Sequence, residues 1–449
     1  MVSFTHRDAS QDEALWLQAL EGAPGLQTLL PDIPERLVVL AAHPDDETLG
    51  AGGLIAALAA EGTSIDVIVA TAGEASHPDS ATHTPERLAQ IREQELRDAV
   101  AALAPQARVR LLGLPDGGLA GCREELRRAL EEAADSGTGP LWIAAPWWHD
   151  GHTDHDTAGE VAAGFAEAVR IPLLEYPIWL WHWGTPRDIP EDLCVFPLGS
   201  RPAQAKRAAM KAHHSQVNPL SDRPGDEVLL GAEVLAHFER PFESFRVTVP
   251  PSARRVFEDL YAGSVDPWNF EGSFYEYRKR ALTLAMLPRE SFGRVFEPGC
   301  SIGVLTAELA RRAESVTAMD ISARALELAR QRVGSAAGVE LVEGSIPENW
   351  PAGTYDLVVI SEIGYFLSRA QLQETVKRTA ASLAPDGVLL LCHWRHPNEG
   401  WPLTGDDVHE AFLRDSGLER LSAHMEADFR IDVLVPPPAE SVARREGLL

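Results

Sequence analysis

Apolar runs and amphipathic stretches alternate along the first half of the chain. Short runs rich in Val, Ile, Leu and Ala predict strands at 36–42, 65–70, 108–112 and 141–145. Between them, residues 86–103 repeat their apolar positions at helical spacing, which predicts an amphipathic helix. Strands that alternate with helices in this way are typical of a mainly parallel sheet, so the first half predicts an α/β domain.

The second half of the chain shows the same alternation. Strands are expected at 294–297, 315–320, 339–343, 355–361 and 388–393. Helices are expected around 303–313 and 322–333. This half therefore predicts a second mainly parallel sheet with its own helices.

The join between the two halves is predicted from a proline pair. Pro250 and Pro251 follow the strand-like run 244–249 and break regular structure. A chain of 449 residues is also longer than one ordinary core supports. We predict two Rossmann-like α/β domains, residues 1–249 and 250–449.

Composition and charge limit the kinds of partner and the cellular location that we expect. The formal net charge of −27 repels phosphate backbones and anionic lipids, so a small neutral or cationic substrate is favoured over nucleic acid. The four cysteines lack the spacing of a zinc ribbon or a disulfide framework. Residues 1–16 lack the apolar region of a secretory signal, and no apolar run is long enough to span a bilayer. We expect a cytoplasmic protein, and the oligomeric state stays open.

Two clusters of His and Asp follow strands of the first half. His43-Pro-Asp45-Asp46-Glu47 comes directly after the first strand, and His149 to His155 comes after the fourth. Each cluster alone is as compatible with a solvated polar loop as with a metal site. Because the carboxyl ends of parallel strands share one sheet edge, the two clusters can converge. Nitrogen and oxygen ligands of this kind favour zinc, and iron or cobalt would accept them too.

These two clusters resemble the motifs of the PIG-L/LmbE family of metal-dependent N-deacetylases. The family's AHPDD motif stands at 42–46 and its HPDH motif at 152–155, with Thr153 in place of the proline. The resemblance implies that His43, Asp46 and His155 hold the metal. It also implies that Asp45 is the general base and His152 the general acid in the hydrolysis of an N-acetyl amide.

Four further positions resemble the substrate-binding positions of that family. They are Arg92, Asp116, His214 and Gln216. An Arg that lies among glutamates, as Arg92 does, is more often part of a surface ion pair, and Asp116 fits an ordinary Pro-Asp-Gly turn equally well. The resemblance implies contacts with the hydroxyl groups of a sugar.

A glycine-containing loop opens the second half. Glu297-Pro-Gly299-Cys-Ser-Ile-Gly303 follows the first predicted strand, and Asp320 ends the next one, where a carboxylate can bind ribose hydroxyls. A dinucleotide dehydrogenase shares this arrangement. Glu297 before the glycines, and Ser301 where the dinucleotide fingerprint has a glycine, favour S-adenosylmethionine instead.

Residues 255–400 resemble class I methyltransferases, and the segment 266–288 resembles the entry segment of nodulation-protein-S-type N-methyltransferases. The first resemblance implies that Glu297, Gly299, Gly303 and Asp320 bind S-adenosylmethionine. It also implies that Ser345 and Ile346 contact the adenine, although the family commonly has Asp at the position of Ser345. The residues expected at the acceptor are Tyr275, Glu362, Tyr365 and His393.

Together the halves predict a bifunctional enzyme. The first would remove an N-acetyl group from an amino sugar or glycoconjugate, and the second would methylate an acceptor, with the freed amine as the leading candidate. Two alternatives stay open. One joins the deacetylase to O-methylation of a natural-product scaffold, and the other makes the second half a non-catalytic S-adenosylmethionine-binding module.

Overall fold

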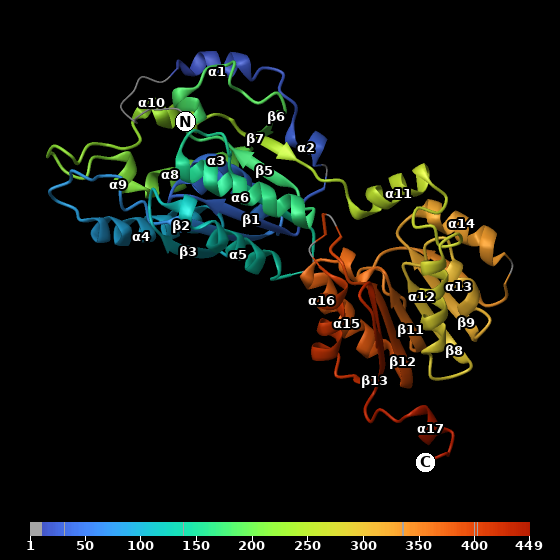
Figure 1. The fold of residues 1–449 in the computed structure, drawn as a ribbon. Helices are drawn as coiled ribbons and strands as arrows, with labels where there is room; N and C mark the ends of the chain where they lie inside the picture. The colour runs from blue at the N-terminus through green and yellow to red at the C-terminus, as the bar shows by residue number, and fades with distance from the viewer. Residues whose placement is uncertain (1–10, 31, 138, 335, 399, 402) are drawn as a thin grey trace. The chain divides into compact units, whose positions relative to one another are not determined.

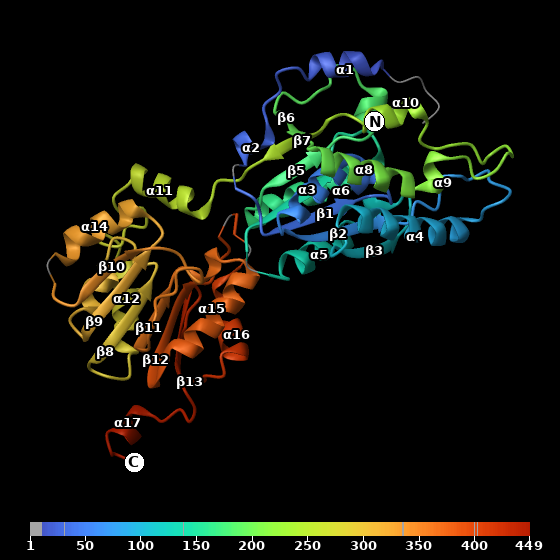
Figure 2. The same cartoon turned by 180° about the vertical axis from the view of Figure 1, so that it is seen from behind.

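The computed structural model describes residues 11–30, 32–137, 139–334, 336–398, 400–401 and 403–449. Its contacts divide the chain between Pro250 and Pro251 into an N-terminal and a C-terminal unit. Each unit contains one seven-stranded sheet with helices packed on it (Figures 1 and 2). The segment 1–16, from which we expect no secretory signal, lies partly outside the described residues.

The sheet of the N-terminal unit is mostly parallel. Its strands are β1 (Arg36–Ala41), β2 (Ser64–Thr71), β3 (Arg108–Leu114), β4 (Leu141–Pro146), β5 (Leu173–Tyr176), β6 (Leu193–Pro197) and β7 (Phe242–Thr248). They lie in the order β3-β2-β1-β4-β5-β7-β6, and β7 is antiparallel to both of its neighbours. β1 and β4 pair in parallel near the middle, and every residue of both strands is buried.

Helices pack on this sheet in two groups. They are α1 (Glu13–Ala19), α2 (Leu26–Leu29), α3 (Asp46–Ala60), α4 (Pro85–Leu103), a 3₁₀ turn (Leu119–Gly121), α5 (Arg123–Ala134), α6 (Thr153–Val169), α7 (Leu180–Trp183), α8 (Ser200–Ala212), α9 (His214–Val217) and α10 (Ala232–Ala236). α3, α4 and α8 contact one another, and α5 contacts α6. Alternate residues of β1 enter different apolar clusters, Leu37 and Val39 one and Val38 and Leu40 the other, as expected for a strand covered on both faces.

The C-terminal unit repeats the same topology. Its strands are β8 (Phe292–Pro298), β9 (Ala313–Asp320), β10 (Val339–Glu343), β11 (Tyr355–Ser361), β12 (Leu383–Trp394), β13 (Glu419–Met425) and β14 (Phe429–Val435). They lie in the order β10-β9-β8-β11-β12-β14-β13, with β14 antiparallel to both neighbours. Counted within each unit, the strand orders of the two sheets are identical.

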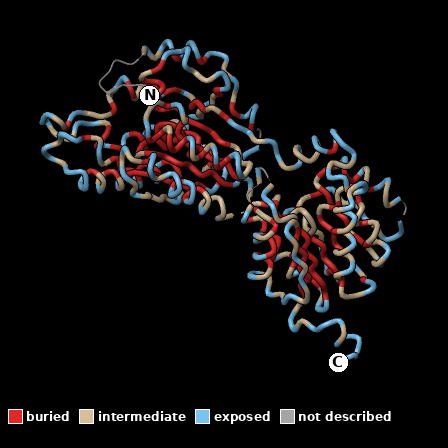
Figure 3. Tube along the Cα trace, in the orientation of Figure 1, coloured by how far each residue is buried: buried red, intermediate tan, exposed pale blue. Residues whose placement is uncertain are grey.

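The helices of the C-terminal unit are α11 (Ala253–Gly263), α12 (Phe274–Ala285), α13 (Val304–Leu309), α14 (Ala323–Val333), a 3₁₀ turn (Gly364–Phe366), α15 (Arg369–Ser382), α16 (Gly405–Asp415) and α17 (Val442–Arg445). The helix expected at 303–313 is shorter than predicted, because β9 begins at Ala313. Figure 3 shows buried residues concentrated along the strands of each unit.

The predicted fold class, two α/β units with mainly parallel sheets, is confirmed. In both sheets the strand order reverses beside the first strand, between β1 and β4 and between β8 and β11. A crevice for ligands opens at such a reversal, beyond the carboxyl ends of the strands. Among the described residues, no helix has the length and apolar character needed to cross a bilayer.

Candidate functional site

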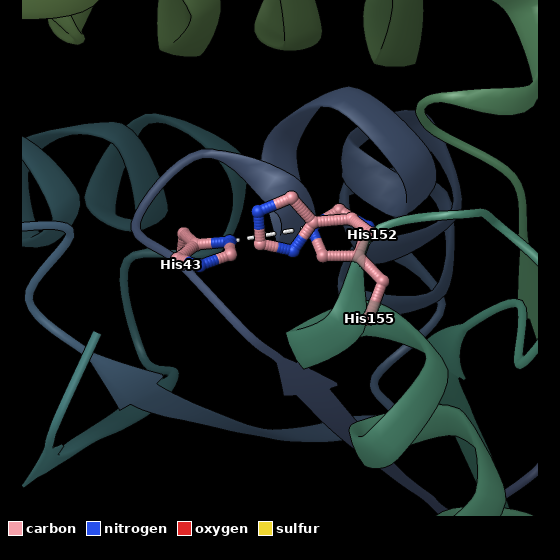
Figure 4. Close-up of side chains that lie close together, drawn as sticks. All are labelled: His43, His152 and His155. Atoms are coloured by element: carbon pink, nitrogen blue, oxygen red, sulfur yellow. Dashed lines mark hydrogen bonds between the residues drawn. The ribbon is translucent and has the colours of Figure 1, made fainter. Parts of the chain in front are cut away.

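The candidate metal centre lies beyond the adjacent ends of β1 and β4. His43 follows β1, Asp46 begins α3, and His155 lies in the first turn of α6, which follows β4. His155 Nε2 lies 3.2 Å from His43 Nδ1 and 3.3 Å from Asp46 Oδ1. Asp46 Oδ2 is 3.7 Å from His43 Nδ1. The two histidines, 112 residues apart in sequence, thus face each other with His152 beside them (Figure 4).

These three side chains fit a divalent metal ion. Ligands arranged tetrahedrally at zinc distances of about 2.0–2.1 Å lie about 3.3 Å from one another, close to the separations found here. Two imidazoles and one carboxylate also match the nitrogen and oxygen ligands of catalytic zinc, with one position left for water or substrate. The ring of His152 lies 4.9 Å from the rings of both His43 and His155, next to the place where the ion would sit.

Neighbouring carboxylates orient the two histidines. His43 Nε2 lies 3.2 Å from Asp116 Oδ1 and 3.4 Å from Asp154 Oδ2. His155 Nδ1 lies 2.7 Å from Asp150 Oδ2, and Asp150 also accepts three backbone N–H groups, those of residues 178–180. These contacts leave His43 Nδ1 and His155 Nε2 free to face the metal position. Neither Asp150 nor Asp154 was assigned a role from the sequence, because contacts with distant segments, residues 178–180 for Asp150 and His43 for Asp154, fix their positions.

Burial and charge set the ionisation of the histidines. Burial lowers the pKa of His155, but nearby carboxylates, Asp46 foremost, reverse this effect and raise the pKa to about 9. Burial, together with the neighbouring His155 and His43, lowers the pKa of His152 to about 3. His152 is therefore neutral at pH 7, so it must receive a proton before it can act as a general acid.

The backbone at Asp45 is strained. Its φ of 134° lies in a region that residues with a side chain rarely adopt. The Asp45 N–H donates to Glu47 Oε2 at 3.1 Å, while Glu47 Oε1 lies 3.6 Å from His213 Nε2. Burial, with the adjacent Asp46, raises the pKa of Asp45 to about 7. Glu47 thus fixes the strained peptide, a role that no sequence pattern indicated.

Arg92 is not part of a surface ion pair. It is only 2% exposed, and its Nη1 donates to the carbonyl oxygen of Gly73 at 2.7 Å. Its Nε and Nη2 have no hydrogen-bond partner among the described residues. Since a buried guanidinium with free N–H groups is costly, these donors are suited to a ligand. Asp116 orients His43 and accepts the N–H of Ala75, so it is more than a turn residue.

In the segment 213–216, a different histidine points inward from the one expected. His214 is exposed, whereas His213 is buried and its Nε2 lies 3.2 Å from Thr48 Oγ1. The expected inward position of His214 is therefore corrected to His213, because the chain turns between α8 and α9 at this point. Gln216 is buried as expected and donates to the carbonyl oxygen of Pro44.

The C-terminal unit has a cavity of about 830 Å³ beyond the ends of its central strands. Glu297, Gly299 and Asp320 line it. Gly299 has a φ of 74°, and a Cβ there would lie 2.1 Å from a methyl group of Ile363. Asp320 accepts the N–H groups of Ser301 and Ser322, which fixes its carboxylate.

These residues fit S-adenosylmethionine. Glu297 is buried, and its Oε2 has no hydrogen-bond partner among the described residues, so a cationic amino group can bind there. Ser345 and Ile346 line the same cavity. Gly303 does not line it. A Cβ at Gly303 would lie 3.1 Å from the Cβ of Ala329, so the structure assigns this glycine to the packing of α13 against α14.

The acceptor end of the cavity lies beside β11 and β12. Tyr275, Glu362, Tyr365 and Trp394 line the cavity. His393 does not: it is fully buried and paired with His409 at 3.1 Å. Successive residues of a strand point to opposite faces, so Trp394 faces the cavity and His393 faces α16. The expected contact of His393 with the acceptor is therefore corrected.

Two family models match the chain. The model of GlcNAc-PI de-N-acetylase, called PIG-L, matches residues 38–166, and the model of nodulation protein S, called NodS, matches residues 256–398. The chain joins a PIG-L domain to a NodS domain. The PIG-L match contains the three metal-binding candidates, and the NodS match contains the cavity residues from Phe257 to Asn398. The predicted resemblance and the order of the two domains are confirmed.

One relative matches the NodS part of the chain and another the PIG-L part. Nodulation protein S of Rhizobium tropici is 27% identical over 36% of this chain and 71% of its own length. The 1D-myo-inositol 2-acetamido-2-deoxy-alpha-D-glucopyranoside deacetylase of Kineococcus radiotolerans is 36% identical over 31% of this chain and only 37% of its own length. The solved structure of N-methyltransferase NodS from Bradyrhizobium japonicum WM9 with S-adenosyl-l-homocysteine is 21% identical, covers 41% of this chain and 100% of that chain, and has a TM-score of 0.39.

Proposed function

We propose that the PIG-L domain removes an N-acetyl group from an amino sugar and that the NodS domain methylates the freed amine. The observation that carries the first half is the convergence of His43, Asp46 and His155 within 3.2–3.7 Å. The printed name of the Kineococcus relative, a deacetylase of an acetamido sugar, supports the substrate class. The second half is supported by the NodS match around a cavity that fits S-adenosylmethionine.

For hydrolysis, a divalent ion held by His43, Asp46 and His155, zinc by the nature of these ligands, would polarise the amide carbonyl and acidify a bound water. Asp45, next to Asp46 and held by Glu47, takes the proton of the attacking water. His152, after receiving a proton, passes it to the leaving nitrogen, because an amine leaves readily only when protonated. The products are acetate and an amine.

Arg92 and Asp116 hold the sugar in the first site. The free N–H groups of Arg92 donate to hydroxyl oxygens, and the carboxylate of Asp116 accepts from a hydroxyl group. Gln216 supports the loop of the first motif through the carbonyl oxygen of Pro44. These contacts position the acetamide beside Asp45 and exclude other orientations.

For methylation, S-adenosylmethionine supplies an electrophilic methyl group on its sulfonium. Glu297 binds the amino group of its methionine part, and Asp320 accepts hydrogen bonds from the ribose hydroxyls. Gly299 lets the loop pass close to the cofactor, and Ser345 and Ile346 contact the adenine. The acceptor lies between α12 and β11, where Tyr275, Glu362 and Tyr365 line the cavity.

The decisive test follows both groups on one substrate. The full chain is incubated with zinc, S-adenosylmethionine and N,N′-diacetylchitobiose, and products are followed by mass spectrometry. We expect loss of acetyl and then gain of methyl on the same sugar. Asp45→Asn should slow acetyl loss by roughly 10²- to 10⁴-fold while the chain keeps its metal, and the exposed Asp98→Asn should change nothing.

Glu297→Gln should leave acetyl loss intact and stop methyl gain. Methylation of a hydroxyl group with the amide intact would contradict the proposal and favour an O-methyltransferase. Binding of S-adenosylmethionine without methyl transfer to any deacetylated product would favour a non-catalytic module.

A further inference from the structure

Several side chains at the acceptor end of the NodS cavity contain a group able to take a proton from an incoming amine. Glu276, Glu362 and Tyr365 are among those that line it, and His393 lies directly behind the lining. Glu276 and the cavity face of α12 lie opposite the loop that follows β11. This end lies past β11 and β12, while Asp320 and Ser345 mark the nucleoside end, so the groups that line it are placed to contact the acceptor.

Glu362 has no oxygen free for the acceptor. Its Oε1 accepts from Lys279 Nζ at 2.7 Å, and its Oε2 accepts from the hydroxyl of Tyr365 and from the backbone N–H of Trp394 at 3.0 Å. Three donors therefore share this carboxylate. It organises the acceptor end of the cavity but has little capacity to take another proton.

Tyr365 and His393 are also engaged. The hydroxyl group of Tyr365 donates a hydrogen bond to Glu362. Burial raises the pKa of this phenol well above its usual value, so Tyr365 keeps its proton at neutral pH. His393 lies outside the cavity lining, and its Nε2 accepts the N–H of Gly364 at 3.2 Å. Neither group can act as a base toward an amine in the cavity.

Glu276 differs from all three. Its Oε1 accepts from Lys279 Nζ at 3.0 Å, while its Oε2 has no hydrogen-bond partner among the described residues. Its side chain lines the cavity and is 13% exposed. We infer that Glu276 binds the protonated acceptor amine and removes its proton before methyl transfer. This inference rests on the proposed N-methyltransferase activity.

The step balances as follows. The acceptor enters as R–NH₃⁺, and one proton passes to Glu276 Oε2, which leaves the nitrogen lone pair free. That lone pair forms a bond to the methyl carbon as the bond between this carbon and the sulfonium sulfur breaks. The electron pair of the broken bond stays on sulfur as a thioether. The proton on Glu276 is later returned to water.

The charges around Glu276 suit a cationic acceptor. Lys279 lies between two carboxylates, those of Glu276 and Glu362, so the cluster has one negative charge in excess. Burial raises the pKa of Glu276, Lys279 opposes this shift, and Glu362 adds to it. Arg280, also on α12, lowers the pKa of Glu276 as Lys279 does, but more weakly. An ammonium group would neutralise this excess charge, whereas a neutral hydroxyl group would not.

The test compares variants on one defined amine. Wild type, Glu276→Gln and the matched control Glu271→Gln, an exposed glutamate bound to Arg332, are assayed as full chains with S-adenosylmethionine. The probe is the free-amine disaccharide of β-1,4-linked glucosamine. At pH 7 we expect Glu276→Gln to lose roughly 10²- to 10⁴-fold in rate. The control should lose nothing, and the affinity for S-adenosylhomocysteine should be unchanged in both variants.

The pH profile separates a base from a structural residue. Above the pKa of the amine no base is required, so the rate of Glu276→Gln should approach that of wild type. Added formate should also restore Glu276→Ala in part, because it supplies the missing carboxylate. A variant equally impaired at every pH, or one as active as wild type at pH 7, would overturn the role of Glu276. Failure of the wild type to methylate the amine would instead overturn the proposed function.

Discussion

Glu297 illustrates how the surroundings of one side chain control a binding step. It is 2% exposed, and burial, with the nearby Asp320, raises the pKa of its carboxyl to about 8. At pH 7 the cofactor-free form therefore holds a proton on Glu297. In the proposed binding mode, the cationic amino group of the methionine part contacts the Glu297 carboxylate, so binding below pH 8 should release that proton.

We predict that the affinity for S-adenosylhomocysteine rises with pH. The increase should approach tenfold per pH unit below about pH 8 and level off above it. Calorimetry over this range measures the effect. Glu297→Gln should bind more weakly with no such slope, and the exposed Glu327→Gln should behave as wild type.

A wild-type affinity that does not change with pH would contradict this linkage. The raised pKa of Glu297 also makes the cofactor-free protein less stable to unfolding as the pH rises from about 4.5 toward 8. The folded state binds the proton more tightly than the unfolded chain over that interval.

The positions of site residues at the end of a strand could be predicted from the sequence. The positions of residues that depend on a turn or on a side-chain contact could not. His43 and Glu297 lie at strand ends, which fixes which sheet edge they reach. The direction of a single side chain in a turn depends on local backbone angles, so His213 rather than His214 points inward. Glu276 was missed because its free oxygen depends on how Lys279 and Glu362 pair across the cavity.

Helix α6 positions two residues of the first site, and one glycine allows its close approach to the loop after β4. A Cβ at Gly159 would lie 2.5 Å from the carbonyl oxygen of Pro146 and 2.7 Å from the backbone nitrogen of Trp148. Backbone atoms cannot relieve such a clash by a change of rotamer, as a flexible side chain can. The helix must therefore move if residue 159 gains a side chain.

We predict that Gly159→Ala destabilises the PIG-L domain by about 1–3 kcal/mol, measured by thermal unfolding of the full chain. It should also weaken metal binding, because α6 carries His155. Gly164→Ala is the matched control on the same helix, since no atom lies within 4 Å of a Cβ there. That variant should be stabilised by about 0.5–1 kcal/mol. Equal stability of the two variants would contradict the close approach.

The central elements of both sheets could be predicted, whereas the last two strands of the C-terminal sheet could not. β1 and β11 are apolar runs covered on both faces, which gives a clear signal. β13 is a partly exposed edge strand, and β14 buries Arg430 and Asp432, so neither shows a simple apolar pattern. The ion pair between these two residues, at 2.7 Å, compensates their burial and is visible only in the fold.

The charge of the whole molecule should affect the two proposed reactions differently. A net charge of −27 attracts cationic molecules over distances of a Debye length and is screened by salt. In the proposed function, the acetylated substrate is neutral, whereas the deacetylated sugar carries ammonium groups. The chain should therefore attract its own intermediate more strongly than its first substrate.

We predict that kcat/KM for methylation of the free-amine disaccharide falls severalfold as NaCl rises from about 50 to about 300 mM. Deacetylation of N,N′-diacetylchitobiose should change by less than about twofold, since a neutral molecule is not steered. Both rates are measured on the same preparation. An equal salt response of the two reactions would show that the negative charge of the protein does not attract the cationic substrate measurably.

The shared strand order of the two units has a consequence for protein engineering. A framework that supports both a candidate hydrolytic metal centre and a candidate alkylation site does not dictate the reaction that it hosts. In each unit, many of the candidate site residues lie in or beside the short connections after the first and fourth strands. Libraries for new reactivity should therefore randomise these connections and leave the underlying scaffold untouched.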